Sequence, residues 1–164
     1  MRAPRPVRSL RWMAGVLFIA TGLAACAGGP VKRVSEPSAR IQQLAVQADG
    51  RWSLQLRIEN FSSMPMRFES VDLGLTVADA DAGRVQATPG LSIGPESADV
   101  VTVMLAPPAA AKLAVADALS AGRSVDYRLS GRIVAAPEER GSRDFEVERR
   151  SALSPAPGLP GVLR

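Results

Sequence analysis

Few residues of this 164-residue chain could carry covalent or metal chemistry. The chain has no histidine, which removes the commonest general base and the commonest metal ligand, and its only lysines are Lys32 and Lys112. Its one cysteine, Cys26, is the only thiol nucleophile. Since neither a Ser–His nor a Cys–His pair can form, we expect no catalytic residues, no cofactor and a protein that is not an enzyme.

Three short motifs contain residue types that could bind a metal ion. Asp79 and Asp81 flank a turn, but the further ligands of a calcium loop are missing, so we interpret them as solvated turn residues. Glu138-Glu139 is likewise interpreted as a polar hairpin tip. Met64-Pro65-Met66 could offer thioethers to Cu(I), or could cover the edge of a hydrophobic core. We expect the packing role and no metal site.

The residues before Cys26 have the order of an export signal. Residues 1–11 carry four arginines and no acid, and the apolar run over residues 12–20 is shorter than the roughly 20 residues that cross a bilayer. Leu23-Ala24-Ala25-Cys26 then resembles the bacterial lipobox. The resemblance implies that residues 1–25 are a lipoprotein signal peptide, and that Cys26 is acylated and becomes the new amino terminus. A plain exported protein with a chance cysteine is the alternative.

Lipidation of Cys26 has consequences for the location of the protein and for the net charge of the mature chain. In many Gram-negative bacteria, lipoprotein signals that retain a protein in the inner membrane have aspartate after the cysteine. Ala27 follows here, which for a host with two membranes implies an outer-membrane lipoprotein facing the periplasm. The chain carries 20 Lys+Arg and 16 Asp+Glu, and removing the four arginines of residues 1–25 equalises them. We therefore expect a membrane partner through the lipid and no nucleic-acid partner.

The two flanks of the mature chain differ in composition from its middle. Residues 26–38 contain Gly28, Gly29, Pro30 and Pro37, and we expect a flexible tether there. Residues 151–164 are rich in proline and glycine, which predicts a disordered or loosely attached tail.

The middle of the chain alternates apolar and polar residues, which is typical of half-buried strands. The clearest strand covers residues 52–59, and Asp49-Gly50 before it predicts a hairpin turn. Further strands are expected near residues 41–46, 71–77, 85–93, 100–105, 125–133 and 143–149. Residues 109–121 follow Pro107-Pro108 and end at Gly122, which predicts one short helix with Leu113, Ala116 and Leu119 toward the core. The pattern predicts an all-β fold, an immunoglobulin/fibronectin-III-like β-sandwich of about seven strands.

Residues 39–150 resemble the late-embryogenesis-abundant type 2 family, also called the water-stress and hypersensitive-response domain. An alternating strand runs into Asn60-Phe61-Ser62, where members of the family have an asparagine-proline-asparagine step, and Gly94-Pro95 precedes a later strand. Asn60 is kept, while Phe61 and Ser62 depart from the pattern. The resemblance implies a β-sandwich with one helix and a link to desiccation and stress tolerance. It carries over no catalytic residue. Asn60 itself suits a strand end, with ligand binding as the alternative.

These observations leave three functional hypotheses. The leading one is a non-enzymatic, membrane-anchored lipoprotein with a role in desiccation or envelope stress. The second is an accessory protein-interaction subunit of an envelope complex, since a sandwich exposes sheet edges that can pair with a partner. The third is a carrier of an apolar ligand in a cavity between the sheets.

Overall fold

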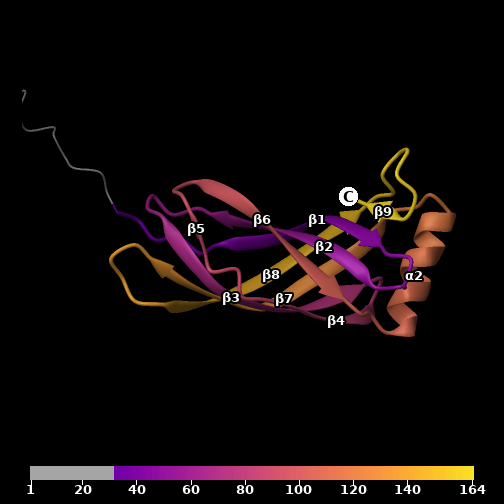
Figure 1. The fold of residues 1–164 in the computed structure, drawn as a ribbon, viewed down its shortest axis with the longest axis horizontal. Coiled ribbons are helices and arrows are strands. Elements are labelled where there is room, and N and C mark those ends of the chain that lie inside the picture. Colours follow the sequence, from indigo (N-terminus) through magenta and orange to yellow (C-terminus); the bar gives the residue numbers. More distant parts are fainter. Residues whose placement is uncertain (1–31) are drawn as a thin grey trace, which may run out of the picture. The chain divides into compact units, whose positions relative to one another are not determined.

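Two antiparallel sheets face each other in the structure, a computed structural model that describes residues 32–164 (Figure 1). The first sheet has the order β6 (Ser97–Leu105), β2 (Trp52–Asn60), β1 (Ser38–Val46) and β9 (Val162–Leu163). The second has the order β4 (Ala80–Ala87), β3 (Met66–Val77), β7 (Val125–Pro137) and β8 (Arg143–Leu153), and β5 (Leu91–Ile93) also pairs with β3. The helix α2 (Ala109–Ser120) lies at one end of the sheets. The predicted all-β sandwich with a short helix is confirmed.

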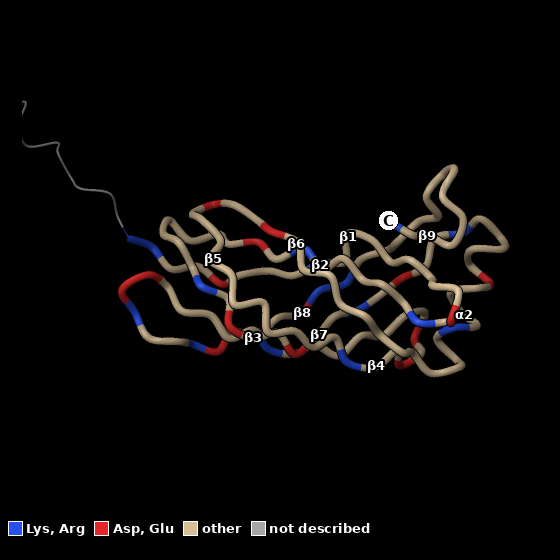
Figure 2. The backbone as a smooth tube through the Cα atoms, in the orientation of Figure 1, with Lys and Arg blue, Asp and Glu red and all other residues tan. Residues whose placement is uncertain are grey.

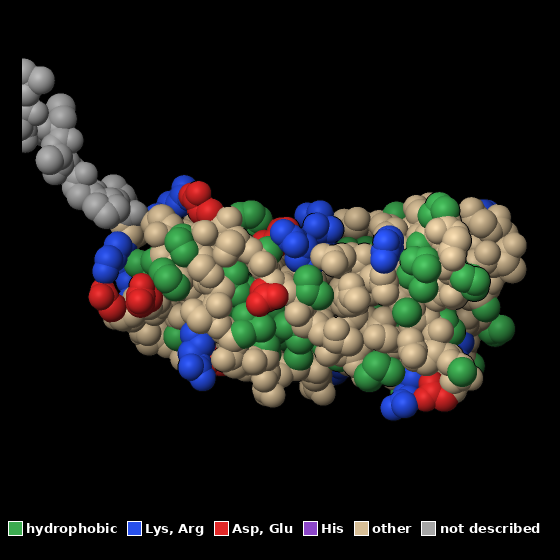
Figure 3. All heavy atoms as spheres, turned by 45° about the horizontal axis from the view of Figure 1, so that its top comes forward, with side chains coloured by type: hydrophobic (Ala, Val, Ile, Leu, Met, Phe, Trp, Pro, Cys, Tyr) green, Lys and Arg blue, Asp and Glu red, His purple; other side chains and the backbone are tan. Residues whose placement is uncertain are grey.

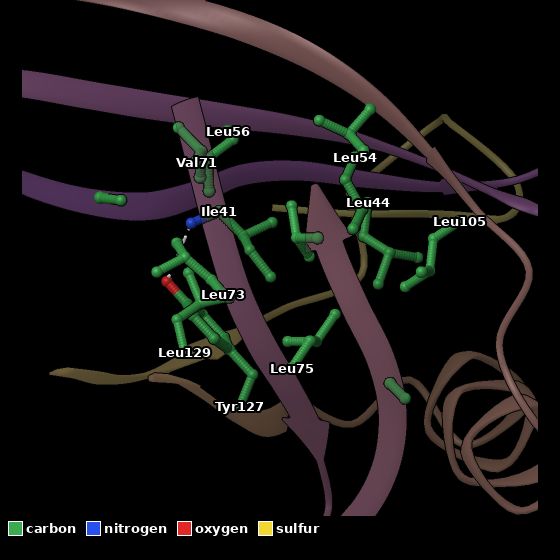
Figure 4. Close-up of a cluster of buried hydrophobic side chains, with 14 of the residues drawn as sticks. Ile41, Leu44, Leu54, Leu56, Val71, Leu73, Leu75, Leu105, Tyr127 and Leu129 are labelled. Carbon is green, nitrogen blue, oxygen red and sulfur yellow. Dashed lines mark hydrogen bonds between the residues drawn. The ribbon is translucent and has the colours of Figure 1, made fainter. Parts of the chain in front are cut away.

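The alternating pattern of the sequence places one face of each strand in the core. On β2 the buried side chains alternate strictly with half-buried ones, and Trp52 and Leu56 belong to the largest fully buried residues. The inner faces of β3 and β7 contribute Leu73, Leu75 and Leu129 from the opposite sheet (Figure 4). The short strands β5 and β9 raise the number of strands above the expected seven or so.

A buried side-chain hydrogen bond joins β1 of the first sheet to β7 of the second. The hydroxyl of Tyr127 on β7 accepts the N–H of Ile41 on β1 at 3.2 Å (Figure 4). The register of β1 with β2 shifts between Ile41 and Gln43, and β9 pairs with β1 only at Leu44 and Ala45. The tyrosine therefore supplies a buried partner to a backbone donor on the unpaired edge of β1.

Replacing Tyr127 with phenylalanine is expected to destabilise the domain by about 2 kcal/mol, because it leaves the buried N–H of Ile41 without an acceptor. Urea unfolding, followed by the fluorescence of the buried Trp52, measures the change. An unchanged m-value is the control for an intact fold. A loss below about 0.5 kcal/mol would contradict the assigned bond.

Helix α2 has the predicted bounds to within one residue, but a different buried face. Its buried residues are Ala111, Val115 and Ala118, while Leu113 is 71% exposed. The expectation that Leu113 and Ala116 face the core is wrong. The spacing of 4 and 3 residues along the buried face is helical, and its small side chains let the helix approach the ends of β3 and β4 closely.

The C-terminal residues are part of the sandwich, which corrects the prediction of a loose tail. β8 continues to Leu153, and β9 adds to the edge of β1 with Leu163 fully buried. Ser154 and Arg164 exchange two backbone hydrogen bonds of 2.6 and 2.8 Å. The segment between them folds back as a loop, so its proline and glycine residues serve turns rather than disorder.

Charges of both signs are interspersed over residues 32–164. Basic and acidic residues are scattered among one another along the backbone (Figure 2), and the face in Figure 3 mixes them with scattered hydrophobic side chains. On the second sheet, Arg84 pairs with Asp72 at 2.7 Å and Arg132 pairs with Asp144 at 3.4 Å. Within the described residues, no helix is long and apolar enough to cross a membrane.

Candidate functional site

The residue to which the sequence assigns chemistry, Cys26, lies outside the described residues, as does the whole predicted signal peptide. Its lipidation stays a prediction. The structure describes the chain from Lys32 onward. The residues that contact its first described residues form the best-defined polar site of the domain. We call residues 32–37 the docked segment.

The docked segment lies against the loop between β2 and β3. Arg33 and Ser63 exchange two hydrogen bonds, since the N–H of Arg33 donates to Oγ of Ser63 at 2.8 Å and the N–H of Ser63 donates to the carbonyl of Arg33 at 3.0 Å. The N–H of Ser35 donates to Oγ of Ser62 at 2.9 Å. Val34 packs on the core and Pro37 is buried. The prediction of a flexible tether over 26–38 is therefore wrong for residues 32–38, whose partners are remote in sequence.

Asn60 is the centre of this site. It is fully buried at the end of β2, and its Oδ1 accepts the N–H of Ser62 at 2.9 Å. Its Nδ2 lies within hydrogen-bond distance of the carbonyl oxygens of Met64 (2.9 Å), Ile93 (3.1 Å) and Gly94 (2.9 Å). Both polar atoms of the amide are thus occupied by backbone groups. The structure supports the strand-end role of Asn60 and leaves it no free group for a ligand.

Ser62 connects Asn60 to the docked segment. The serine is fully buried, and its Oγ lies 3.3 Å from the carbonyl of Ser35 and 3.0 Å from Sδ of Met66. Met64 and Met66 are both buried, so their thioethers belong to the core edge. Burial therefore favours the packing interpretation of Met64-Pro65-Met66 over a copper contact.

Four segments meet at the same end of the sandwich, which we call the N-terminal end: the docked segment and residues 61–65, 94–96 and 138–142. Lys32 Nζ pairs with Glu139 at 2.6 Å, which joins the docked segment to the hairpin between β7 and β8. The N–H of Glu96 donates to the carbonyl of Ser62 at 3.1 Å, and that of Glu138 donates to Pro65 at 3.0 Å. Helix α2 lies at the opposite end (Figure 1).

The other candidate residues are dispersed. Asp79 lies in the turn between β3 and β4, and the Oδ1 of Asp81 accepts the N–H of Gly83 at 2.8 Å. Glu139 is in the hairpin tip, as expected, and Lys112 is exposed on α2. In residues 32–164 no three histidine, cysteine, aspartate or glutamate side chains are grouped so that they could hold a metal ion.

Glu59, next to Asn60, is the most strongly embedded carboxylate of this end. Burial raises its pKa, but hydrogen bonds from Arg57 (3.0 Å) and Ser38 (3.0 Å) and the charge of Arg40 outweigh burial, so the pKa of Glu59 is lowered from its ordinary 4.5. The carboxylate of Glu59, on β2, therefore binds Ser38 and Arg40 at the start of β1, across the outer face of the sheet.

A lowered pKa predicts a loss of stability in acid. The ionised form of Glu59 is favoured in the folded state, so its contribution is present above pH 4.5 and disappears as the pH falls through the folded-state value. Urea unfolding at a series of pH values between about 7 and about 3 measures this loss of stability. The Glu59→Gln variant is expected to be less stable near neutrality and to show a shallower decline. Parallel declines in the two proteins would contradict this role.

One hollow of the described part is lined by charged and hydroxyl side chains together with alanines and Val125. It has a volume of about 970 Å³ and lies between α2 and the strands β7 and β8. Arg128 and Arg150 stand opposite each other in the strand register, and Arg150 pairs with Glu148 at 3.4 Å. Arg123 pairs with Asp117. This lining does not suit an apolar ligand, so the carrier hypothesis gains no support from it.

Comparisons with known proteins agree on the fold alone. No known family model matches the sequence, and no curated protein matches it. A solution structure of a protein from Arabidopsis thaliana is similar with a TM-score of 0.50 and 12% identity, covering 80% of this chain and 89% of that one. A solution structure described as a candidate late embryogenesis abundant protein has a TM-score of 0.47 and 16% identity, with 93% and 86% covered. A crystal structure of a protein from Archaeoglobus fulgidus has a TM-score of 0.44 and 11% identity, with 76% and 98% covered.

Proposed function

We propose that this chain is a non-enzymatic lipoprotein of the cell envelope whose β-sandwich has a role in desiccation or envelope stress. The observation that carries the proposal is Leu23-Ala24-Ala25-Cys26 at the end of an export-type segment. Ala27 after the cysteine favours the outer membrane, with the domain in the periplasm. The bilayer is then the main partner, and the balanced charge of the mature chain favours no nucleic acid.

The buried polar groups of the domain stabilise its fold. Its buried side-chain nitrogen and oxygen atoms, in the part that the structure describes, all have a hydrogen-bond partner. Asn60 and Ser62, its fully buried polar residues, bind backbone groups of three separate segments. A polar network that is satisfied internally stabilises a fold. The stress role itself rests on the resemblance of residues 39–150 to the late-embryogenesis-abundant type 2 family.

Attachment and stress role need separate tests. Metabolic labelling with an alkyne fatty acid is expected to mark the chain in the host membrane, and the Cys26→Ser variant, still exported, is expected to lose both the label and the membrane fraction. An unlabelled wild-type protein would refute the anchor. A deletion strain is expected to survive drying less well than its parent, with rescue by the wild-type gene. Equal survival would refute the stress role and leave the anchor standing.

A second candidate function is that of a protein-interaction subunit. Leu113 on α2 is 71% exposed, and Leu159, which is 43% exposed, lines a hollow of about 660 Å³ together with Ala116 and Leu119 of α2. Exposed apolar side chains at one end of a domain are candidates for a protein contact. Cross-linking in cells, with Leu113→Asp as the variant and Lys112→Asp as its exposed neighbour control, tests this function. A stoichiometric partner lost only in Leu113→Asp would favour it over the stress role.

A further inference from the structure

The connection between the predicted lipid and the domain is short. Backbone hydrogen bonds of Arg33 and Ser35 fix the docked segment to the loop after β2, so the chain leaves the sandwich at Lys32. Cys26 precedes Lys32 by six positions. Such a length reaches at most about 20 Å when fully extended. A lipid on Cys26 therefore keeps the N-terminal end of the sandwich close to the bilayer, whatever path the intervening residues take.

Phe61 is the large hydrophobic residue that this end exposes. Its side chain is 48% exposed, although both neighbours, Asn60 and Ser62, are fully buried and hydrogen-bonded. Since the backbone is held on both sides of it, the ring cannot turn inward without breaking the Asn60 network. The backbone carbonyl of Phe61 also accepts a hydrogen bond from Nη2 of Arg33 at 3.4 Å. The ring is thus fixed outward beside the point where the chain leaves.

The charged residues around Phe61 are balanced. Lys32 pairs with Glu139, and Arg33 lies 3.9 Å from Glu96. This end therefore lacks the excess of basic residues that binds anionic lipids from a distance. It has instead an exposed apolar ring, and Phe, like Trp and Leu, is a side chain that interfacial segments bury at the boundary between headgroups and acyl chains.

The remaining exposed large hydrophobic residues of the described part lie elsewhere. Leu113 and Leu159 are near α2, at the opposite end of the sandwich, and Val46 and Met104 are at the ends of β1 and β6 that point toward it (Figure 1). With the N-terminal end held near the bilayer, these side chains are directed away from it. Among these exposed large hydrophobic residues, Phe61 alone lies near Lys32, where the chain toward Cys26 leaves the sandwich.

We propose that the N-terminal end of the sandwich rests on the bilayer that holds the lipid of Cys26, with the ring of Phe61 at the headgroup–acyl boundary. The inference rests on the proposed lipidation of Cys26 and adds an orientation to it. The sheets then extend away from the membrane and present α2 to the periplasm. Because Lys32 and Arg33 are already paired, the contact depends on the ring more than on lipid charge.

Tryptophan fluorescence in vesicles tests this contact. The acylated full-length product, isolated from host membranes, carries Phe61→Trp and is reconstituted into phosphatidylethanolamine/phosphatidylglycerol vesicles with and without brominated acyl chains. After subtraction of the unsubstituted protein, whose Trp52 is buried, emission from position 61 is expected to fall roughly twofold with brominated lipid, as for a ring at the boundary. The matched control, Leu113→Trp at the opposite end, is expected to keep its emission.

The outcomes separate the contact from the anchor. Mass spectrometry of the isolated protein first reports acylation of Cys26, and a chain without lipid refutes the anchor and this inference together. An acylated protein with equal quenching at positions 61 and 113, or with none at 61, refutes the contact and leaves the anchor intact. Hydrogen exchange of the unsubstituted protein gives a second reading. Amides of residues 61–64 are expected to exchange more slowly on vesicles than in the Cys26→Ser form, and equal rates would also refute the contact.

Discussion

Replacing Gly131 with alanine is expected to destabilise the domain more than any other single methyl group added to its sheets. Gly131 is in the middle of β7 with φ of 152°, a conformation that residues with a side chain rarely adopt. A Cβ there would lie 2.3 Å from the carbonyl oxygen of Asp72 and 3.0 Å from Cα of Leu73. Both atoms belong to the backbone of β3, so relief requires separation of the two central strands.

We expect the Gly131→Ala variant to lose on the order of 4 kcal/mol, because steric overlap and backbone strain add at one site. That is a large share of the 5–15 kcal/mol typical of a domain, so partial unfolding at room temperature is an alternative readout. Urea unfolding by Trp52 fluorescence and far-ultraviolet circular dichroism measure it.

Gly74 provides a matched control in the neighbouring strand. It also lies inside the second sheet, opposite Ser130, but a Cβ there would meet nothing closer than the Ser130 carbonyl at 3.5 Å, an ordinary contact. Gly74→Ala is expected to change stability by less than about 1 kcal/mol. If the two variants were equally stable, the close approach of β3 and β7 at Gly131 would be refuted.

The sequence predicts those parts of this fold that depend on local pattern. The alternation of apolar and polar residues in β2 predicts that one face of the strand is buried. Asp49-Gly50 predicts a turn, and Gly50 has φ of 77° there. Neither feature needs a distant partner. The all-β class and the helix follow from such patterns.

The errors concern contacts between distant segments. In the alanine-rich helix α2, several faces are similarly apolar, so the choice between Leu113 and Val115 depends on how closely the sheet ends approach. The proline-rich C-terminal residues become ordered because the free edge of β1 accepts β9. For α2 and for the C-terminal residues alike, amino-acid composition does not show which distant segment they pack against.

The polar site at the N-terminal end was predicted only in part. The sequence predicts a strand end at Asn60, because asparagine bonds nearby backbone groups. Its contacts to Ile93 and Gly94, and the capture of Ser35 by Ser62, join segments that are remote in the chain. Ser62 and Ser63, which follow Phe61, are the available signal, since hydroxyls commonly bond loop backbone, but nothing local names their partners.

Replacing Asn60 with leucine, a side chain of similar size, is expected to destabilise the domain by roughly 3 kcal/mol. The carbonyls of Met64, Ile93 and Gly94 lose their shared donor, and the N–H of Ser62 loses its acceptor, in a buried region. Hydrogen exchange is also expected to quicken at the amide of Ser35, because the loop that holds it is released. Ser62→Ala is the matched control, since it removes the acceptor of Ser35 but keeps the Asn60 amide.

The Asn60→Asp variant distinguishes hydrogen bonding from size. An ionised carboxylate would face three carbonyl oxygens without a proton to donate, so the pKa of the new aspartate is expected to rise in the folded state. Its protonated form then stabilises the domain in acid, and this stability disappears as the pH rises through the raised pKa. The direction is opposite to that expected for Glu59, one residue earlier. Unfolding at a series of pH values should therefore show Asn60→Asp approaching the wild type as the pH falls, whereas Asn60→Leu keeps a constant deficit. If both variants kept the same deficit at every pH, packing rather than the amide donor would hold the loop.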